Sequence, residues 1–286
     1  APAAPAAATA AAQLATLGAD PTQSEASEAE LRARASALFA AQRWQDASDA
    51  YGRLLVLYPA LPDREQLNVR RGTAAGNARD AATAAVALTL VTNRDPELQA
   101  EALYQLAMAY KRAVQYDQYE ATGSRLRALY PKSDWTGKYL GDLVDYLESK
   151  NRLAEQYQVQ RALIENFPKS EKAAEASYDL AWLSYKTSDY RHAAELFTEH
   201  LATFRTPQTK WVGEAAFWGG RAWERLGNVP RALFFYALAA SRYPYGYHGQ
   251  IASRRIDLIR QRDPKARPEE PADGSQLAKA RENALA

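Results

Sequence analysis

The stretches Leu57-Tyr58-Pro59, Leu129-Tyr130-Pro131, Asn166-Phe167-Pro168 and Arg242-Tyr243-Pro244 each place an aromatic residue directly before a proline. Phe204 and Pro207 form a looser copy of this aromatic-Pro motif. From Pro131 the prolines follow at steps of 37, 39 and 37 residues, and the 72 residues from Pro59 to Pro131 make two such steps with one copy missing. A fixed period of this length is typical of repeat proteins, in which most residues serve the packing of one repeat on the next.

The composition limits the classes of function. The chain has 286 residues, of which 47% are hydrophobic and 24% charged, so it has the composition of a folded protein. Its net charge of +2 gives no reason to expect a nucleic-acid partner. The absence of cysteine excludes disulfides, thiol catalysis and thiolate metal sites. No apolar run approaches the roughly 18 residues of a transmembrane segment.

The first 24 residues predict a disordered leader, because residues 1–12 are nearly all alanine and proline and the first charge is Asp20. Such composition resembles the linkers that follow signal peptides in exported bacterial proteins. We therefore expect a periplasmic protein whose signal peptide is absent from this chain. A chain cut from a longer protein is the alternative.

Apolar residues at three- and four-residue spacing predict helices from Glu25 onward, and no stretch of useful length alternates as a strand would. Each proline of the aromatic-Pro motif stops a helix. We predict an all-α fold, an α-solenoid over residues 25–262 built from about six helical hairpins. The pair over 64–93, split near Gly76-Asn77, is the weakest. The predicted hairpins cover residues 28–58, 64–93, 100–130, 135–167, 172–204 and 211–243.

The spacing inside the hairpins resembles that of the tetratricopeptide repeat (TPR) family. Gly220 and Ala232 lie twelve residues apart, and Tyr236, Ala239 and Pro244 follow at four, three and five residues. Small residues at such points let two helices approach closely, and the aromatic residue fills the groove between them. The first hairpin repeats the pattern with Ala35, Ala47, Tyr51 and Pro59. After the hairpins, we predict a helix from Ser253 to Arg262, a linker over residues 263–275 and the start of a further helix over residues 276–286.

Motifs of catalysis and cofactor binding are missing from the sequence. It contains no nucleophile elbow, P-loop, HExxH or dinucleotide fingerprint. Gly219-Gly220 lies among helical residues, so close helix packing explains it. His192, His200 and His248 have no metal-ligand spacing. We expect no cofactor, no metal site and no catalytic residue in this chain, which leaves open whether the parent protein is an enzyme.

Tyr245, Tyr247 and His248 stand outside the repeat register and are the candidate binding residues. Their rings could stack on sugars or hold a peptide, and the alternative is packing of the next helix. The surrounding residues 245–268 carry six basic and two acidic side chains, a local charge of +4. This stretch either meets an anionic surface or forms a solvated helix.

The segment from Ser241 to Ala252, which reads SRYPYGYHGQIA, resembles the junction in soluble lytic murein transglycosylases, where a helical superhelix ends before the linker and catalytic domain. The resemblance covers about residues 25–262. It implies a non-catalytic helical scaffold of a periplasmic peptidoglycan lytic transglycosylase, with glycan strands and its own downstream lysozyme-like domain as partners. The family's catalytic Glu-Ser pair is missing here, and the only methionine is Met108, in a repeat helix. No catalytic residue therefore transfers to this sequence.

Two other functions remain open. The chain could be a stand-alone TPR-type envelope adaptor that binds envelope proteins in a concave groove. A cytoplasmic TPR co-chaperone would need clustered lysine and arginine on the first helix of each hairpin to clamp a peptide carboxylate. Those helices carry few basic residues here, so this third function ranks last.

Overall fold

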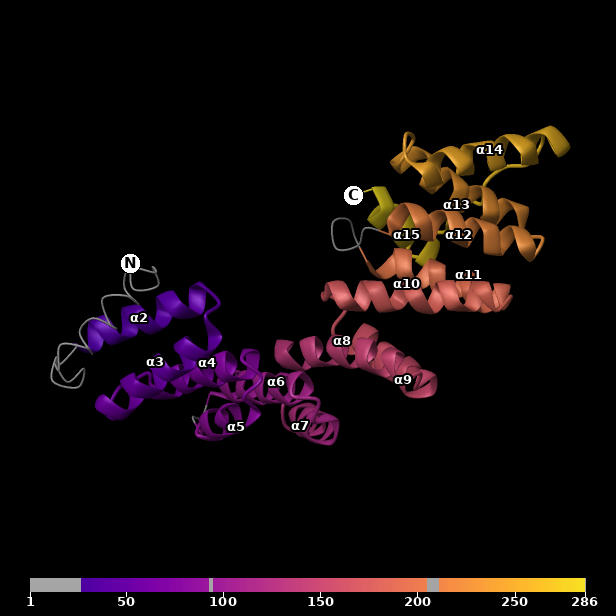
Figure 1. The fold of residues 1–286 in the computed structure, drawn as a ribbon. Helices are drawn as coiled ribbons and strands as arrows, with labels where there is room; N and C mark the ends of the chain where they lie inside the picture. Colours follow the sequence, from indigo (N-terminus) through magenta and orange to yellow (C-terminus); the bar gives the residue numbers. More distant parts are fainter. Residues whose placement is uncertain (1–26, 93–94, 205–210, 286) are drawn as a thin grey trace. The chain divides into compact units, whose positions relative to one another are not determined.

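The computed structural model describes residues 27–92, 95–204 and 211–285, and within these ranges every regular element is a helix (Figure 1). None of the described helices is both long and apolar enough to cross a membrane. The chain divides into two compact units, one ending at Thr136 and the other beginning at Gly137. The predicted leader lies outside the described residues, and the domain boundaries proposed at 24 and 262 stay predictions.

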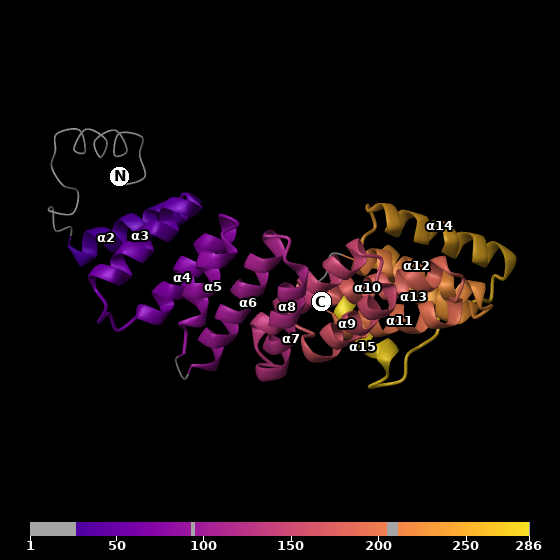
Figure 2. The ribbon, with the colours of Figure 1, turned by 60° about the horizontal axis from the view of Figure 1, so that its bottom comes forward.

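The predicted fold class, an all-α solenoid of about six TPR-like hairpins, is confirmed. The helices pair along the chain as α2 with α3, α4 with α5, α6 with α7, α8 with α9, α10 with α11 and α12 with α13, and α14 and α15 follow (Figures 1 and 2). The bounds are α2 (Glu28–Ala40), α3 (Trp44–Leu57), α4 (Arg64–Asn77), α5 (Ala81–Thr89), α6 (Pro96–Arg112), α7 (Tyr116–Leu129), α8 (Asp134–Ser149), α9 (Leu153–Asn166), α10 (Glu171–Lys186), α11 (Tyr190–Thr203), α12 (Val212–Arg225), α13 (Val229–Arg242), α14 (Tyr247–Arg262) and α15 (Gln276–Leu285).

The turn inside each of the six hairpins has the same backbone geometry. One residue lies in the left-handed region, with φ between 55° and 76°; these residues are Gln42, Arg79, Val114, Asn151, Ser188 and Gly227. The next N–H donates to the carbonyl five residues earlier, as from Arg43 to Leu38 at 3.0 Å. This bond closes the C-terminus of the first helix and sets the direction of the second.

The aromatic-Pro motif closes four of the six hairpins at the other end, namely those that finish with α3, α7, α9 and α13. Its aromatic residue caps the second helix, with φ near −130° in Tyr130, Phe167 and Tyr243. The following proline disfavours the helical region at that residue. The ring then packs on the first helix of its own hairpin: a Cβ at Gly213 would lie 2.7 Å from the Tyr243 ring, and one at Gly137 would lie 2.8 Å from the Phe167 ring. The motif therefore joins the end of a hairpin to its beginning.

The small and aromatic positions predicted from the TPR-like spacing are buried as expected. Ala35, Ala47 and Tyr51 are fully buried in the first hairpin, and Ala232, Tyr236 and Ala239 are fully buried in the last. A Cβ at Gly220 would lie 2.8 Å from the Tyr236 ring, which confirms that this glycine serves close helix packing.

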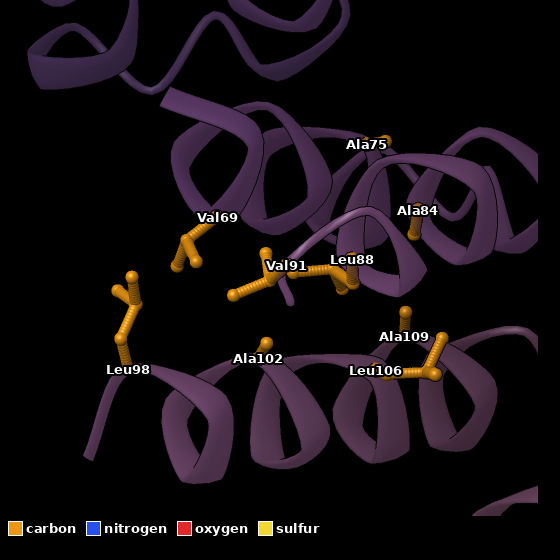
Figure 3. Packing of buried hydrophobic residues seen from close by; sticks show 9 residues of the cluster. All are labelled: Val69, Ala75, Ala84, Leu88, Val91, Leu98, Ala102, Leu106 and Ala109. Atoms are coloured by element: carbon orange, nitrogen blue, oxygen red, sulfur yellow. The ribbon is translucent and has the colours of Figure 1, made fainter. Parts of the chain in front are cut away.

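The core of the weak hairpin is small but continuous (Figure 3). Leu88 and Val91 pack between α4 and the facing side of α6, which contributes Leu98, Ala102, Leu106 and Ala109. A Cβ at Gly72 would lie 2.3 Å from Leu88. The missing side chain at Gly72 thus lets the nine-residue α5 lie close against α4.

Two helix starts differ from the sequence prediction. Helix α6 begins at Pro96 and not at Ala100, because Asp95 accepts a hydrogen bond from the Glu97 N–H at 3.0 Å and proline suits the first turn. Helix α14 begins at Tyr247, one and a half turns before the predicted Ser253. The predicted last helix forms as α15, and it lies along α11 (Figure 2).

Candidate binding surface

Seven side-chain rings form a continuous chain of contacts across unit 2. The chain runs from Tyr190 to Tyr185 and Trp182, then to Trp218 and Phe217, and ends at His248 and Tyr247. We call these seven residues the aromatic strip. Successive ring centroids lie 4.6–5.8 Å apart, within the range of favourable aromatic contacts. The strip connects α10, the first residue of α11, α12 and α14.

The centre of the strip lies between two neighbouring first helices, α10 and α12. Trp182 and Trp218 are 36 residues apart, whereas the equivalent turn residues Ser188 and Gly227 are 39 apart, so the two indoles are offset by about one helical turn in the repeat register. Because α10 and α12 are the first helices of successive hairpins, the two indoles meet, with centroids 4.6 Å apart. Tyr185 stacks on Trp182 at 5.8 Å with an interplanar angle of 6°. Trp182, Tyr185 and Trp218 are each only partly buried, so the centre of the strip is open to solvent.

Charged side chains flank both tryptophans in the same order. Asp179 precedes Trp182 by three residues, and Lys186 follows it by four, with Nζ 5.9 Å from the indole centroid. Glu214 precedes Trp218 by four residues, and Arg221 follows it by three. Helical residues at such spacing share a face. The strip therefore has an acidic end, where the helices begin, and a basic end, where they finish.

The acidic end has more negative charge than its neighbours neutralise. Partial desolvation by the surrounding protein raises the pKa of Asp179 to about 6, although the residue itself is exposed to solvent; repulsion by Glu175 and Glu148 adds to the rise, while Lys172 and Lys186 oppose it. Lys172 is already engaged, with its Nζ 3.0 Å from Glu175 and 3.4 Å from Asp145. The two lysines therefore offset the effect of the neighbouring carboxylates on Asp179 only in part.

The three residues predicted from the sequence have different positions. Tyr247, 72% exposed, and His248 form one end of the strip, with their centroids 5.2 Å apart. His248 also contacts Phe217 and lies with Nδ1 3.7 Å from Glu214. Tyr245 projects from the preceding turn and is 93% exposed. Binding by these residues stays a prediction, whereas the packing of His248 on α12 is a structural finding.

Gly249 explains why the Tyr-Gly-Tyr-His-Gly segment has this form. A Cβ at Gly249 would lie 1.8 Å from the carbonyl oxygen of Tyr243, so only glycine allows α14 to begin against the end of α13. This contact places His248 and Tyr247 beside α12.

A partly buried charged network holds the middle of α14. The carboxylate of Glu224 accepts hydrogen bonds from Tyr236 at 2.6 Å, from Arg221 at 3.3 Å and from Arg255 of α14. Burial alone would raise the pKa of Glu224, but the bonds from Tyr236 and Arg255 hold that pKa below its usual range. The network joins α12, α13 and α14 and so holds the strip's helices in place.

Sequence reasoning missed Trp182, Tyr185 and Trp218 as surface residues, because it assigned most aromatic residues to repeat packing. The repeat register does not pair the two tryptophans, since equivalent positions of these hairpins, such as Ser188 and Gly227, are 39 residues apart and the tryptophans are 36 apart. Their contact follows from the packing of α10 beside α12.

A cavity of about 370 Å³ lies apart from the strip, where the segment after α14 crosses α13 on its way to α15. Its lining includes Glu195, Trp223, Arg231 and Glu269. Arg231 is already paired with Glu269 at 2.8 Å and lies 4.6 Å from the Trp223 ring centroid. Among the described residues no group of three or more potential ligands could hold a metal ion.

The sequence matches no family model and no curated protein sequence. Three solved structures are similar at low identity. The chain is 15% identical to BtubC (BKLC) from P. vanneervenii, covering 88% of this chain and 98% of that one with a TM-score of 0.42. The TPR2AB-domain:pHSP90 complex of yeast Sti1 is 12% identical, with coverage of 81% of this chain and 96% of that one and a TM-score of 0.33. The APC/C hetero-tetramer Cut9-Hcn1 is 12% identical, with coverage of 90% of this chain and 55% of that one and a TM-score of 0.27. The assignment of a helical repeat fold rests on the helices and turns themselves.

Proposed function

We propose that this chain is a non-catalytic scaffold that binds other proteins through the aromatic strip. The observation that carries the proposal is the contact between Trp182 and Trp218, two partly exposed indoles on successive first helices. Tryptophan and tyrosine are the residues most enriched at the centres of protein interfaces, because they bury a large area for little loss of side-chain freedom.

The repeat architecture supports a long, segment-like partner. Repeat proteins present side chains of successive units as one extended surface. The strip spans the first helices α10 and α12 and the following helix α14, so a partner lying across them would meet an aromatic side chain at each. This pattern suits a peptide segment that runs across the repeats.

Replacement of the two central indoles tests the proposal. We expect the double variant Trp182→Ala, Trp218→Ala to lose at least about tenfold in affinity for a purified, identified partner, since interface tryptophans contribute about 2 kcal/mol or more each. Trp44→Ala is the matched control, because Trp44 is also partly buried but packs against Phe39 in the first hairpin. Isothermal titration calorimetry measures the affinity, and circular dichroism checks that the variants fold. Equal affinity of the double variant and the control would contradict the proposal.

A more specific form of the proposal is the periplasmic scaffold of a peptidoglycan lytic transglycosylase, whose downstream domain would cleave the glycan. The specific support is the junction motif, in which Tyr245 and Tyr247 are 93% and 72% exposed. Exposed rings of this kind can stack on sugars. Sedimentation with purified murein sacculi tests it, with Tyr245→Ser, Tyr247→Ser as the comparison and fractionation of the native protein as the test of a periplasmic location.

The sedimentation experiment separates the two forms of the proposal. Co-sedimentation that is lost in the double tyrosine variant supports the glycan-binding scaffold. Failure to sediment, together with binding of a protein partner, supports the stand-alone envelope adaptor.

A further inference from the structure

We propose that the segment bound by the aromatic strip carries an arginine or lysine side chain, which lies over the Trp182–Trp218 pair and forms an ion pair with Asp179. This inference rests on the proposed function and names the chemistry of the partner.

The balance of charge at the acidic end supports a cationic partner. At this end of the strip acidic side chains outnumber basic ones. The five acidic residues are Asp145, Glu148, Glu175, Asp179 and Glu214, and the two basic residues are Lys172 and Lys186. Lys172 lies between Asp145 and Glu175, and Lys186 lies toward the basic end over Trp182. Asp179 makes no ion pair with any residue that the structure describes. A positive group from outside would fill this position.

The rings of the strip already show the interaction that a partner cation would use. The Lys186 ammonium lies 5.9 Å from the Trp182 centroid, and the Arg225 guanidinium lies 5.5 Å from the Tyr190 centroid. Both distances are within about 6 Å, the range of cation–π attraction. These two cations belong to the last turns of α10 and α12, four residues after Trp182 and seven after Trp218.

The same charges argue against other classes of partner. The phosphates of nucleic acids and of anionic lipid headgroups would be repelled by Asp179, Glu175 and Glu148. Neutral sugars would gain stacking on the indoles but nothing from the carboxylates. A basic protein segment uses both the rings and the acidic end.

The test compares two peptides that differ only in charge. One is an unstructured twelve-residue Gly-Ser peptide with three arginines, and the other carries citrulline, which has nearly the same shape without the charge. We expect the arginine peptide to bind at least about tenfold more tightly in calorimetric titrations at low ionic strength, a difference that salt reduces. Equal affinity of the two peptides, or no binding of either at millimolar concentration, would overturn the inference.

Two variants locate the cation. Asp179→Asn keeps the side-chain shape and should remove most of the preference for the arginine peptide. Asp117→Asn removes an exposed carboxylate from α7 of unit 1 and should leave the preference unchanged. An unchanged preference in Asp179→Asn would contradict the assigned site.

The two sets of variants distinguish failure of the cation inference from failure of the proposed scaffold function. If an identified partner loses affinity with the double tryptophan variant but not with Asp179→Asn, the scaffold function stands and the cation inference fails. If the tryptophan variant binds normally, the proposed function itself fails.

Discussion

At the scale of single residues, the six hairpin turns share one conformation but not one residue. Only Gly227 suits the left-handed region without cost, and the other five turns place a side chain there. Val114, with φ of 62°, is the least suited because its Cβ is branched. Since Val114 is 66% exposed, packing compensates little of this backbone cost.

The substitution Val114→Gly should therefore stabilise the protein by about 1 kcal/mol, the cost of a left-handed residue with a side chain. The reverse exchange at the equivalent turn, Gly227→Val, should destabilise by a similar amount. Chemical denaturation of both variants measures the free energies of unfolding. A stability equal to wild type in both would show that the turn conformation carries no such cost.

His200 is a second residue with a measurable consequence. Its side chain is fully buried between Tyr178 and Phe204, and neither ring nitrogen has a hydrogen-bond partner among the described residues. Burial lowers the pKa of His200 to about 3. In the unfolded chain the same imidazole takes up a proton near its ordinary pKa of 6.5. Between pH 6.5 and 3 the unfolded chain therefore binds a proton at His200 that the folded chain does not bind. The contribution of neutral His200 to the free energy of unfolding is complete above pH 6.5 and is lost as the pH falls from 6.5 toward 3.

Wild type should lose about 2 kcal/mol of stability through this group between pH 7.5 and pH 5, and His200→Leu should remove that loss. His192→Gln is the control, since His192 lies near the start of α11 and is only partly buried. Denaturation at the two pH values measures the difference. An unchanged pH dependence in His200→Leu would assign the acid sensitivity to other groups.

At the scale of elements, the position of α14 depends on one close contact. The α14 backbone at Gly249 approaches the carbonyl oxygen of Tyr243 so closely that no Cβ fits, as the distance of 1.8 Å shows. The obstructing atom belongs to the backbone and cannot rotate away. Any side chain at this position must move α14 as a whole, and His248 and Tyr247 with it.

We predict that Gly249→Ala costs about 1–3 kcal/mol, as overpacking of a tight site does. Gly246→Ala is the matched control, because its Cβ would meet its nearest neighbour at 3.4 Å, an ordinary contact. Thermal denaturation measures stability, and hydrogen exchange of the α14 amides measures the displacement. Equal protection of α14 in the two variants would contradict the role given to Gly249.

At the scale of the whole molecule, the last helix of unit 2 packs against an earlier helix of the same unit, since α15 lies on α11. After α14, residues 263–275 cross α13, where the Glu269 N–H donates to the Pro230 carbonyl at 2.9 Å. Helix α15 then lies on α11, and the Asn283 side chain donates to the Ala202 and Leu201 carbonyls at 2.8 and 3.2 Å. These bonds cap the C-terminus of α11 with an amide from a distant part of the chain.

A charge placed beneath α15 should detach it. Ala280 is fully buried, and Ala280→Asp would place an unpaired carboxylate there at a cost of several kcal/mol. Lys279→Asp introduces the same residue at an exposed neighbouring position and should be tolerated. Limited proteolysis over residues 276–285 and hydrogen exchange of α11 measure the detachment. Resistance of Ala280→Asp to both would show that α15 does not depend on this contact.

The sequence by itself determined the elements. Each helix end depends on groups close along the chain: a proline that stops the second helix, a left-handed turn closed by a bond over five residues, and an apolar stripe at helical spacing. These are short-range interactions, so they can be recognised in a single sequence. The exceptions at α6 and α14 are helix starts, where a capping residue or a glycine contact extended the helix beyond the apolar pattern.

The tertiary structure decided which side chains meet. Trp182, Trp218 and His248 come from three helices, and sequence spacing indicated a repeat without showing that these rings are open to solvent. The location of α15 was equally hidden, because Asn283 finds its carbonyl partners about 80 residues earlier in the chain. A helix face can pack against many surfaces of similar hydrophobicity, and only the complete fold selects one. The strip and the return of α15 are therefore properties of the packed molecule.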